Sequence, residues 1–278
     1  MNSNRSGVVG PDPIAPGERK RGDLQGTKRT WTAETVRVSL FPAAGAPARD
    51  DLWQTITGAK PDATTTTKEG MVQQQGTVDG KRYLLVSMPG RVDLFMSPPE
   101  DADEIPPNIG PHTDALTAVK GFGSRLAEQL EAVTRIGVGG VILHFLDSKK
   151  DAYAALERRF PCLNFAKDAA DDFLLQLNRP IRSAVITELQ MNRIVRWAYL
   201  PVHQAQLLVV QALGPSGPTS SSRSSPTTTV KHAVRLDIDV NTAAANTTAF
   251  SKDQSAALVA ETADKILGLV DDALDGGK

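Results

Sequence analysis

The amino-acid sequence predicts an α+β fold built from two similar β-α-β-meander-α halves, with antiparallel sheets and two long covering helices. Apolar and polar residues alternate along many short segments, which is typical of half-buried strands. Two longer segments repeat their apolar residues every three or four positions, the period of an amphipathic helix. The order strand, helix, several strands, long helix occurs twice, which indicates an internal duplication, although the halves share no residue-level repeat.

The first half is expected over residues 30–133 and opens with a strand over residues 32–41, where apolar and polar side chains alternate. A short helix follows and ends at Gly58. Two further alternating segments flank the pair Asp79-Gly80, whose residues tolerate the positive φ that a tight hairpin turn requires. The sequence therefore predicts a β-hairpin as the start of a meander.

This half continues with a third meander strand over residues 91–96 and closes with a long helix over residues 116–133. An acidic, proline-rich segment over residues 97–111 connects them and is expected to run over the surface. Charged residues separate the apolar positions of the helix, so one apolar stripe is expected to pack on the sheet.

The second half is expected over residues 134–278, and its first strand, residues 134–147 (TRIGVGGVILHFLD), is predicted to be buried between the two halves. Gly137, Gly139 and Gly140 resemble a phosphate-binding turn, but the P-loop lysine and the spacing before a helix are missing. We therefore expect these glycines to allow close packing, against a neighbouring helix and where the halves meet.

The rest of this half repeats the predicted order of elements. Ser148 is placed to cap a helix, and Ser251 with Gln254 forms a capping box at the start of the last helix. The predicted strands between these helices cover residues 173–177, 184–190, 194–200, 206–213 and 232–240, with a tight turn at residues 191–192.

Two segments are too polar to pack. Residues 1–29 combine Gly, Pro, Ser and charge and are predicted to form a disordered basic arm. Residues 214–229 are rich in Gly, Pro, Ser and Thr and are predicted to form a disordered insert at the tip of a hairpin.

Composition restricts the class of protein further. The formal net charge of -1 argues against a surface built entirely for nucleic acid. The single cysteine, Cys162, lies between apolar neighbours, so it is predicted to be buried, and neither an intramolecular disulfide nor a multi-cysteine zinc site can form. Apolar runs stay below the roughly 18 residues of a membrane span, and a signal-peptide core is missing, so a cytoplasmic protein without a membrane partner is predicted. The sequence predicts no cofactor.

One candidate binding site lies on a predicted hairpin over residues 178–199. Guanidinium groups beside aromatic rings suit phosphates, stacked bases or an acidic protein surface. The alternative is structural: the arginines pair with Asp171, Asp172 and Glu188 around a packed tryptophan. A regular strand also points Arg193 and Arg196 to opposite faces. The candidate binding residues are Arg179, Arg182, Arg193, Arg196, Trp197 and Tyr199.

A second candidate site rests on carboxylates. Asp237 and Asp239 share one face of a predicted strand, and Asp93 lies on the corresponding strand of the first half. Together they could hold magnesium in a nuclease-like or hydrolase-like centre. Evenly spaced acids on a strand are more often solvated or ion-paired, and no catalytic residue is assigned.

Four segments, MPGRVDLFMSPPED, VTRIGVGGVILHF, DFLLQLNRP and VRLDIDVN, resemble, in that order, an uncharacterised, sporadically distributed family of bacterial proteins of about 250 residues. The resemblance covers most of the chain after residue 29 and contains no chemical motif. It implies a bacterial cytoplasmic protein with an α+β fold, linked to a defence or mobile-element locus, and it supplies no catalytic residues.

These observations favour a non-catalytic adaptor that binds a protein partner through its exposed sheet or the groove between its halves. Nucleic-acid binding by the arginine hairpin is the first alternative, and a metal-dependent nuclease or hydrolase using the three aspartates is the second. The sequence thus favours a non-catalytic protein over an enzyme.

Overall fold

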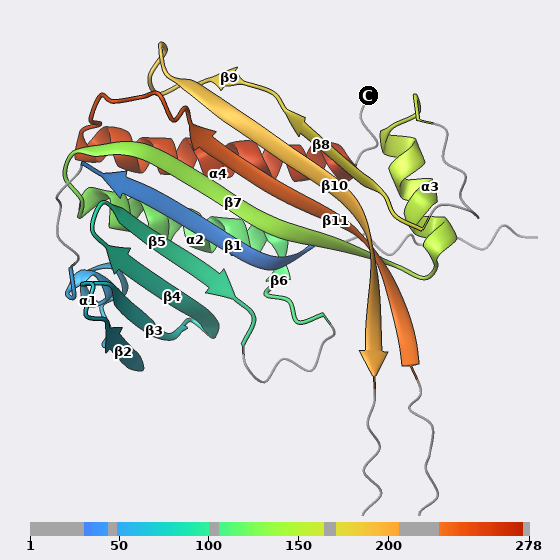
Figure 1. Ribbon diagram of the computed structural model, residues 1–278, viewed down its shortest axis with the longest axis horizontal. Helices are drawn as coiled ribbons and strands as arrows, with labels where there is room; N and C mark the ends of the chain where they lie inside the picture. Colours follow the sequence, from blue (N-terminus) through green and yellow to red (C-terminus); the bar gives the residue numbers. More distant parts are fainter. Residues whose placement is uncertain (1–30, 44–48, 100–105, 164–170, 206–227, 275–278) are drawn as a thin grey trace, which may run out of the picture.

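The computed structural model describes residues 31–43, 49–99, 106–163, 171–205 and 228–274. These residues form one antiparallel sheet and four helices, in agreement with the predicted α+β class (Figure 1). The elements in chain order are β1 (Thr32–Pro42), α1 (Leu52–Thr57), β2 (Ala63–Thr66), β3 (Val72–Val78), β4 (Lys81–Met88), β5 (Arg91–Ser97), β6 (Gly110–Pro111), α2 (His112–Glu128), β7 (Val133–Leu146), α3 (Lys149–Arg159), β8 (Leu174–Asn178), β9 (Ile181–Arg182), β10 (Gln190–Ala205), β11 (Thr228–Thr242) and α4 (Lys252–Leu274).

The strand order is β2-β3-β4-β5-β1-β7-β11-β10-β8, with β6 beside β1 and β9 beside β10. The two predicted halves therefore share a single sheet, joined where β1 pairs with β7. The strands of the two predicted halves thus lie side by side in one sheet rather than in two sheets packed face to face. Element order agrees with the proposed duplication but does not by itself establish it.

The two long helices, α2 and α4, cover the same face of the sheet, as predicted (Figure 1). They pack against each other and against the central strands, where the alternating apolar side chains of β1, β7 and β11 form the core. Fully buried members include Val38 on β1, Leu126 on α2, Leu236 on β11 and Ile266 on α4. Burying one face of each strand in this way leaves the polar positions on the other face.

Local signals in the sequence account for several boundaries. Asp79 and Gly80 form the β3–β4 turn with φ of 51° and 71°, as the hairpin prediction required. Gly58 ends α1 in the left-handed region, with φ of 76°. The Ser148 hydroxyl accepts a hydrogen bond from the Asp151 backbone N–H at 3.1 Å and caps α3.

The glycines of β7 allow close approach, but to neighbouring strands rather than to a helix. A Cβ on Gly139 would lie 2.8 Å from the Ile238 carbonyl oxygen on β11, and one on Gly140 would lie 2.9 Å from the Thr35 carbonyl oxygen on β1. The expectation of helix packing is therefore wrong. Close approach across the β1–β7 junction of the two predicted halves is seen for Gly140 alone of these two glycines.

The strand predicted over residues 184–190 is wrong, and so is the tight turn at residues 191–192. The Ser183 hydroxyl accepts hydrogen bonds from the backbone N–H groups of Val185 and Ile186, at 3.0 and 3.1 Å. A local turn therefore uses donors that a sheet ladder would need. The chain enters β10 at Gln190 and continues through residues 191–192 without a turn.

Three further boundaries differ from expectation. Helix α2 ends at Glu128, and Ala132, with φ of 52°, reverses the chain before β7 instead of extending the helix to residue 133. Cys162 follows α3 and is exposed, so its predicted burial is wrong. Residues 228–229 belong to β11, whereas the remaining predicted insert, the basic arm and the strand predicted over residues 206–213 lie outside the described residues.

Candidate functional site

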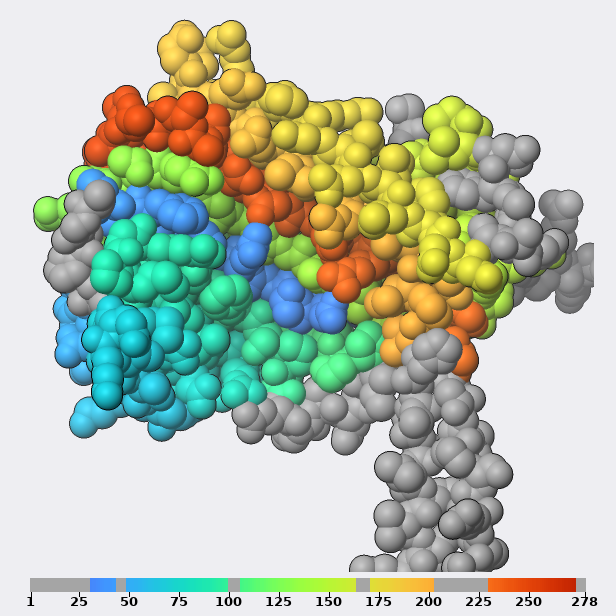
Figure 2. All heavy atoms as spheres, viewed as in Figure 1, coloured from blue at the N-terminus to red at the C-terminus, as the bar shows by residue number. Residues whose placement is uncertain are grey.

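The face of the sheet opposite α2 and α4 is covered by no helix among the described residues, and we call it the open face (Figures 1 and 2). It carries the side chains that alternate with the core positions along each strand. Arg37, for example, lies between the buried Val36 and Val38 on β1. The open face therefore combines polar and charged side chains with partly exposed apolar ones such as Phe95 and Val141.

Each of six neighbouring strands contributes one arginine to the open face. In sheet order from β4 through β5, β1, β7 and β11 to β10, these are Arg82, Arg91, Arg37, Arg135, Arg235 and Arg196. Strands in a sheet lie about 4.8 Å apart, so this set extends over roughly 24 Å across the strands. Three aspartates share the face, and amide side chains occupy neighbouring positions, namely Gln73, Gln75, Gln176, Asn178, Asn192 and Asn241.

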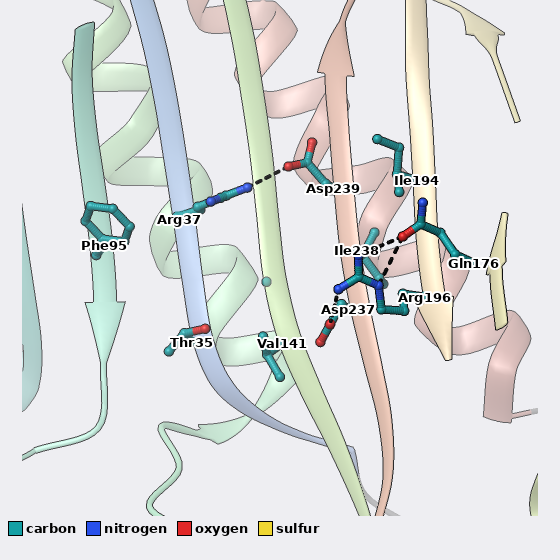
Figure 3. A pocket seen from close by; sticks show the side chains of 11 residues that line it. Thr35, Arg37, Phe95, Val141, Gln176, Ile194, Arg196, Asp237, Ile238 and Asp239 are labelled. Carbon is teal, nitrogen blue, oxygen red and sulfur yellow. Dashed lines mark hydrogen bonds and ion pairs between the residues drawn. The ribbon is translucent and has the colours of Figure 1, made fainter. Parts of the chain in front are cut away.

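A hollow of about 570 Å³ lies near the centre of the open face, over β1, β7, β11 and β10 (Figure 3). On one side of it the Arg37 guanidinium contacts the Asp239 carboxylate at 2.6 Å. On the other side Arg196 donates to the Gln176 side-chain oxygen at 2.7 and 3.1 Å and lies 3.8 Å from Asp237. Figure 3 shows both arginines reaching across the strands rather than out of the hollow.

These ion pairs orient the arginines more than they stabilise the fold. The side chains of Arg37 and Asp239 keep 45% and 31% of their exposure, and exposed pairs contribute at most about 1 kcal/mol. Asp237 also accepts a hydrogen bond from Arg235 Nε at 2.7 Å, so one carboxylate serves two arginines. The guanidinium groups are thus held near the sheet surface with donors left over.

A second cluster on the open face surrounds Phe41 of β1 and includes residues of the neighbouring strands β5 and β7. The Phe41 ring lies between the guanidinium groups of Arg91 and Arg135, whose Cζ atoms are 5.3 and 4.9 Å from the ring centroid. Arg91 Nε is 2.7 Å from the carboxylate of Asp93, which is only 3% exposed. Two arginines therefore cover the apolar ring of Phe41.

The structure separates the predicted arginine hairpin instead of assembling it. Arg196 lies on the open face, whereas Arg193 and Trp197 lie on the helix-covered face, because residues an odd number apart on a strand point in opposite directions. Arg182 is exposed and lies 3.8 Å from Glu188, one of the acids that the structural alternative named. Arg179 joins Arg193 on the helix-covered face.

Tyr199 and Asp171 also have partners other than an arginine. The Tyr199 hydroxyl and His232 Nδ1 are 2.8 Å apart, and burial raises the pKa of Tyr199. Asp171, expected beside an arginine, instead accepts a hydrogen bond from Lys149 at 2.8 Å, which lowers the pKa of that carboxyl. Tyr199 thus belongs to the packed face and not to an arginine surface.

The three aspartates of the metal hypothesis do not converge. Asp93 on β5 is separated from Asp237 and Asp239 on β11 by β1 and β7, about 14 Å at the usual strand spacing. Within the described residues, no group of three or more His, Cys, Asp or Glu side chains is placed to hold a metal ion. This geometry gives no support to a centre built from these three residues.

Sequence reasoning found one of the six arginines of the open face, Arg196, and missed the other five. A usable signal was present, since each is a cation at the polar position of an alternating strand. What the sequence lacked was the strand order that puts β4, β5, β1, β7, β11 and β10 next to one another.

The fold and this surface define an α+β protein with one exposed, arginine-bearing antiparallel sheet face. A scan against protein-family models and a search of curated proteins find no match to the chain. The resemblance to a bacterial family therefore stays a prediction. Among the described residues, no helix has the length and apolar character needed to cross a membrane.

Proposed function

We propose that the protein binds nucleic acid through the open face, with the arginines contacting backbone phosphates. The observation that carries this proposal is the contribution of one arginine from each of six adjacent strands. Guanidinium groups form bidentate, charge-assisted hydrogen bonds with phosphate oxygens, and phosphate contacts supply most of the affinity of sequence-independent binding. Six arginines against three aspartates leave the face positive although the chain as a whole carries a net charge of -1.

The dimensions of the face support the same conclusion. The path of nine strands from β2 to β8 is about 38 Å wide at the usual strand spacing. One turn of a DNA duplex measures about 34–36 Å, so a turn fits across the sheet. Asparagine and glutamine side chains beside the arginines can donate to and accept from base edges and sugars.

A protein partner, the adaptor function that the sequence favoured, has less support from this surface. Stable protein interfaces are centred on aromatic and apolar anchors. On the open face Phe41 is covered by Arg91 and Arg135, and Leu174, the most exposed large apolar side chain among the described residues, lies on the edge strand β8. Phe95, Val141 and Ile194 line the hollow but are only partly exposed, so this surface offers a protein partner few exposed apolar anchors.

The direct test is fluorescence anisotropy with labelled 20-mers of duplex DNA, single-stranded DNA and RNA, at 50 and 200 mM salt. We expect at least one probe to bind and to lose affinity steeply as salt rises, because bound phosphates release counterions. The double variant Arg37→Gln, Arg135→Gln should weaken binding and reduce the salt slope by roughly two. Arg158→Gln, which removes an exposed cation on α3, on the other side of the sheet, should leave both unchanged.

Several results would contradict the proposal. They are absence of binding to all three probes at low salt, binding that is insensitive to salt, and equal losses for the double variant and for Arg158→Gln. The melting temperature of each variant must match that of the original protein, which exposed positions such as Arg37 and Arg158 should permit. Binding of an acidic protein with no nucleic-acid binding would favour the adaptor function instead.

We also infer that the two halves arose by duplication, as element order in the sequence suggested. The support is the position of β1 and β7 side by side at the centre of the sheet, each flanked on its other side by a later strand of its own half, β5 or β11. Each half then ends in a helix on the same face, α2 or α4. Superposing the described residues of one half on the other tests this, and failure of the strands to coincide would reject it.

A further inference from the structure

A separate pocket lies on the helix-covered side of the sheet, beneath the outer strands β8 and β10. It encloses about 270 Å³ and is bordered by the end of α3, the last turns of α4 and the inward side chains of the two strands. We call it the arginine pocket, after Arg159, Arg179 and Arg193, which line it. It is on the opposite side of the sheet from the open face, because Arg193, which lines the pocket, and Arg196, which lies on the open face, point to opposite sides of β10.

Three arginines line this pocket. None of the described residues that line it carries a carboxylate. Arg159 donates through Nη1 to the backbone carbonyl of Asp272 at 3.2 Å, which uses one of its five N–H donors. The Arg179 backbone N–H, directly after β8, donates to the Arg193 carbonyl on β10 at 3.0 Å, which holds the backbones of these two arginines together. Like charges gathered around one cavity favour an anion inside it.

The wall of the pocket is aromatic. Trp197 is 5% exposed, and the Phe160 ring meets it edge-on, with ring centroids 5.6 Å apart. The Arg159 guanidinium lies 5.7 Å from the Trp197 ring centroid. Aliphatic side chains, including Leu177 and Leu269, complete the lining. A ligand that fits therefore needs a flat apolar part as well as an anionic group.

We propose that the arginine pocket binds a small organic anion, a carboxylate or phosphate attached to one or two planar rings. The arginines hold the anionic group in charge-assisted, bidentate hydrogen bonds, and the ring lies against Trp197 and Phe160. Its volume is below the range of about 300–1,000 Å³ typical of pockets for drug-sized ligands, which restricts the ring system to one or two rings. This site does not depend on nucleic-acid binding at the open face.

Calorimetry on the full chain tests the proposal with three probes: 2-naphthoate, phenyl phosphate and the neutral 2-naphthylmethanol. We expect at least one of the two anions to bind and the alcohol not to bind. Which anion binds more tightly distinguishes a carboxylate site from a phosphate site. Binding should also change tryptophan emission, because the ligand contacts Trp197.

Two variants on one strand give a matched comparison. Arg193→Gln should weaken the bound anion about 10-fold or more, since a hydrogen bond to a charged group is lost. Arg196→Gln, three residues along β10 but on the open face, should leave the affinity unchanged. Arg179→Gln, an exposed position, repeats the test if the first variant does not fold.

The proposal is overturned if neither anion binds at millimolar concentration, if the neutral alcohol binds as well as the anions, or if Arg196→Gln weakens binding as much as Arg193→Gln. Loss of anion binding in Arg193→Gln with intact nucleic-acid binding would show that the two sites are independent. Failure of nucleic-acid binding alone would leave the pocket unaffected.

Discussion

Replacing Gly139 by alanine tests whether close approach of strands holds the centre of the sheet together. The new Cβ would lie 2.8 Å from the Ile238 carbonyl oxygen, a distance that real Cβ atoms essentially never show. That oxygen belongs to the backbone of β11, which is hydrogen-bonded to β7 on one side and to β10 on the other. The strand cannot move away without disturbing both pairings.

Overpacking of this kind costs about 1–3 kcal/mol in unfolding free energy. For a protein of this size each kcal/mol corresponds to about 2–4 °C, so the melting temperature should fall by about 2–12 °C. Gly268→Ala is the matched control, because Gly268 is an exposed helical glycine with no atom within 4 Å of the added Cβ. It should stabilise α4 by up to about 1 kcal/mol.

Differential scanning calorimetry of both variants decides the question through the sign of each shift. The expected pair of results is a lower melting temperature for Gly139→Ala and an equal or higher one for Gly268→Ala. A melting temperature for Gly139→Ala at or above that of the original protein would refute the close-approach explanation. The glycine would then serve another purpose.

Two further substitutions test links to α4. Burial acts to raise the pKa of the Glu261 carboxyl, but hydrogen bonds from the Ala184 N–H at 2.6 Å and the Ser183 hydroxyl at 2.5 Å, together with Lys265, lower it overall. A carboxyl whose pKa is lowered in the folded state stabilises the protein at pH values above its usual pKa of 4.5, and this stabilisation is lost as the pH falls below that value. Glu261→Gln should therefore reduce the free energy of unfolding most at neutral pH and least in acid, as urea titrations can measure. Equal losses at both pH values would reject this explanation. Ser251→Ala removes the acceptor of a 3.2 Å N-cap hydrogen bond at the start of α4, so the free energy of unfolding should fall by about 1 kcal/mol in the same urea assay. An unchanged free energy of unfolding would show that the cap does not stabilise the helix.

Local signals were sufficient where a few adjacent residues decide the conformation. The Asp79-Gly80 turn, the Ser148 cap and the Ser251 capping box were each predicted from short-range chemistry and are confirmed. The loop after Ser183 was not, because its alternating side chains looked like a strand while the carboxylate of Glu261, distant in sequence, and a local turn took its backbone donors.

In the candidate sites, too, local patterns predicted some features, and contacts between residues distant in sequence decided the others. The sequence pointed to arginines and aromatic residues over residues 178–199, and alternation alone predicted that Arg193 and Arg196 would separate. It could not show that Arg159 of α3 would reach Arg193 to line a pocket. Nor could it show that Arg37 of β1 would meet Asp239 of β11, since that contact depends on three strands pairing in one register.

By itself, the sequence determined the fold class, most of the longer elements and the apolar face of the central strands, because these depend on residue spacing and local backbone preferences. Only the tertiary structure decided that both halves share one sheet, that six arginines from separate strands form the open face and that three others surround a pocket. Those arrangements come from pairings between residues far apart in the chain, whose register is fixed by burial of the whole core and is not encoded in any short segment.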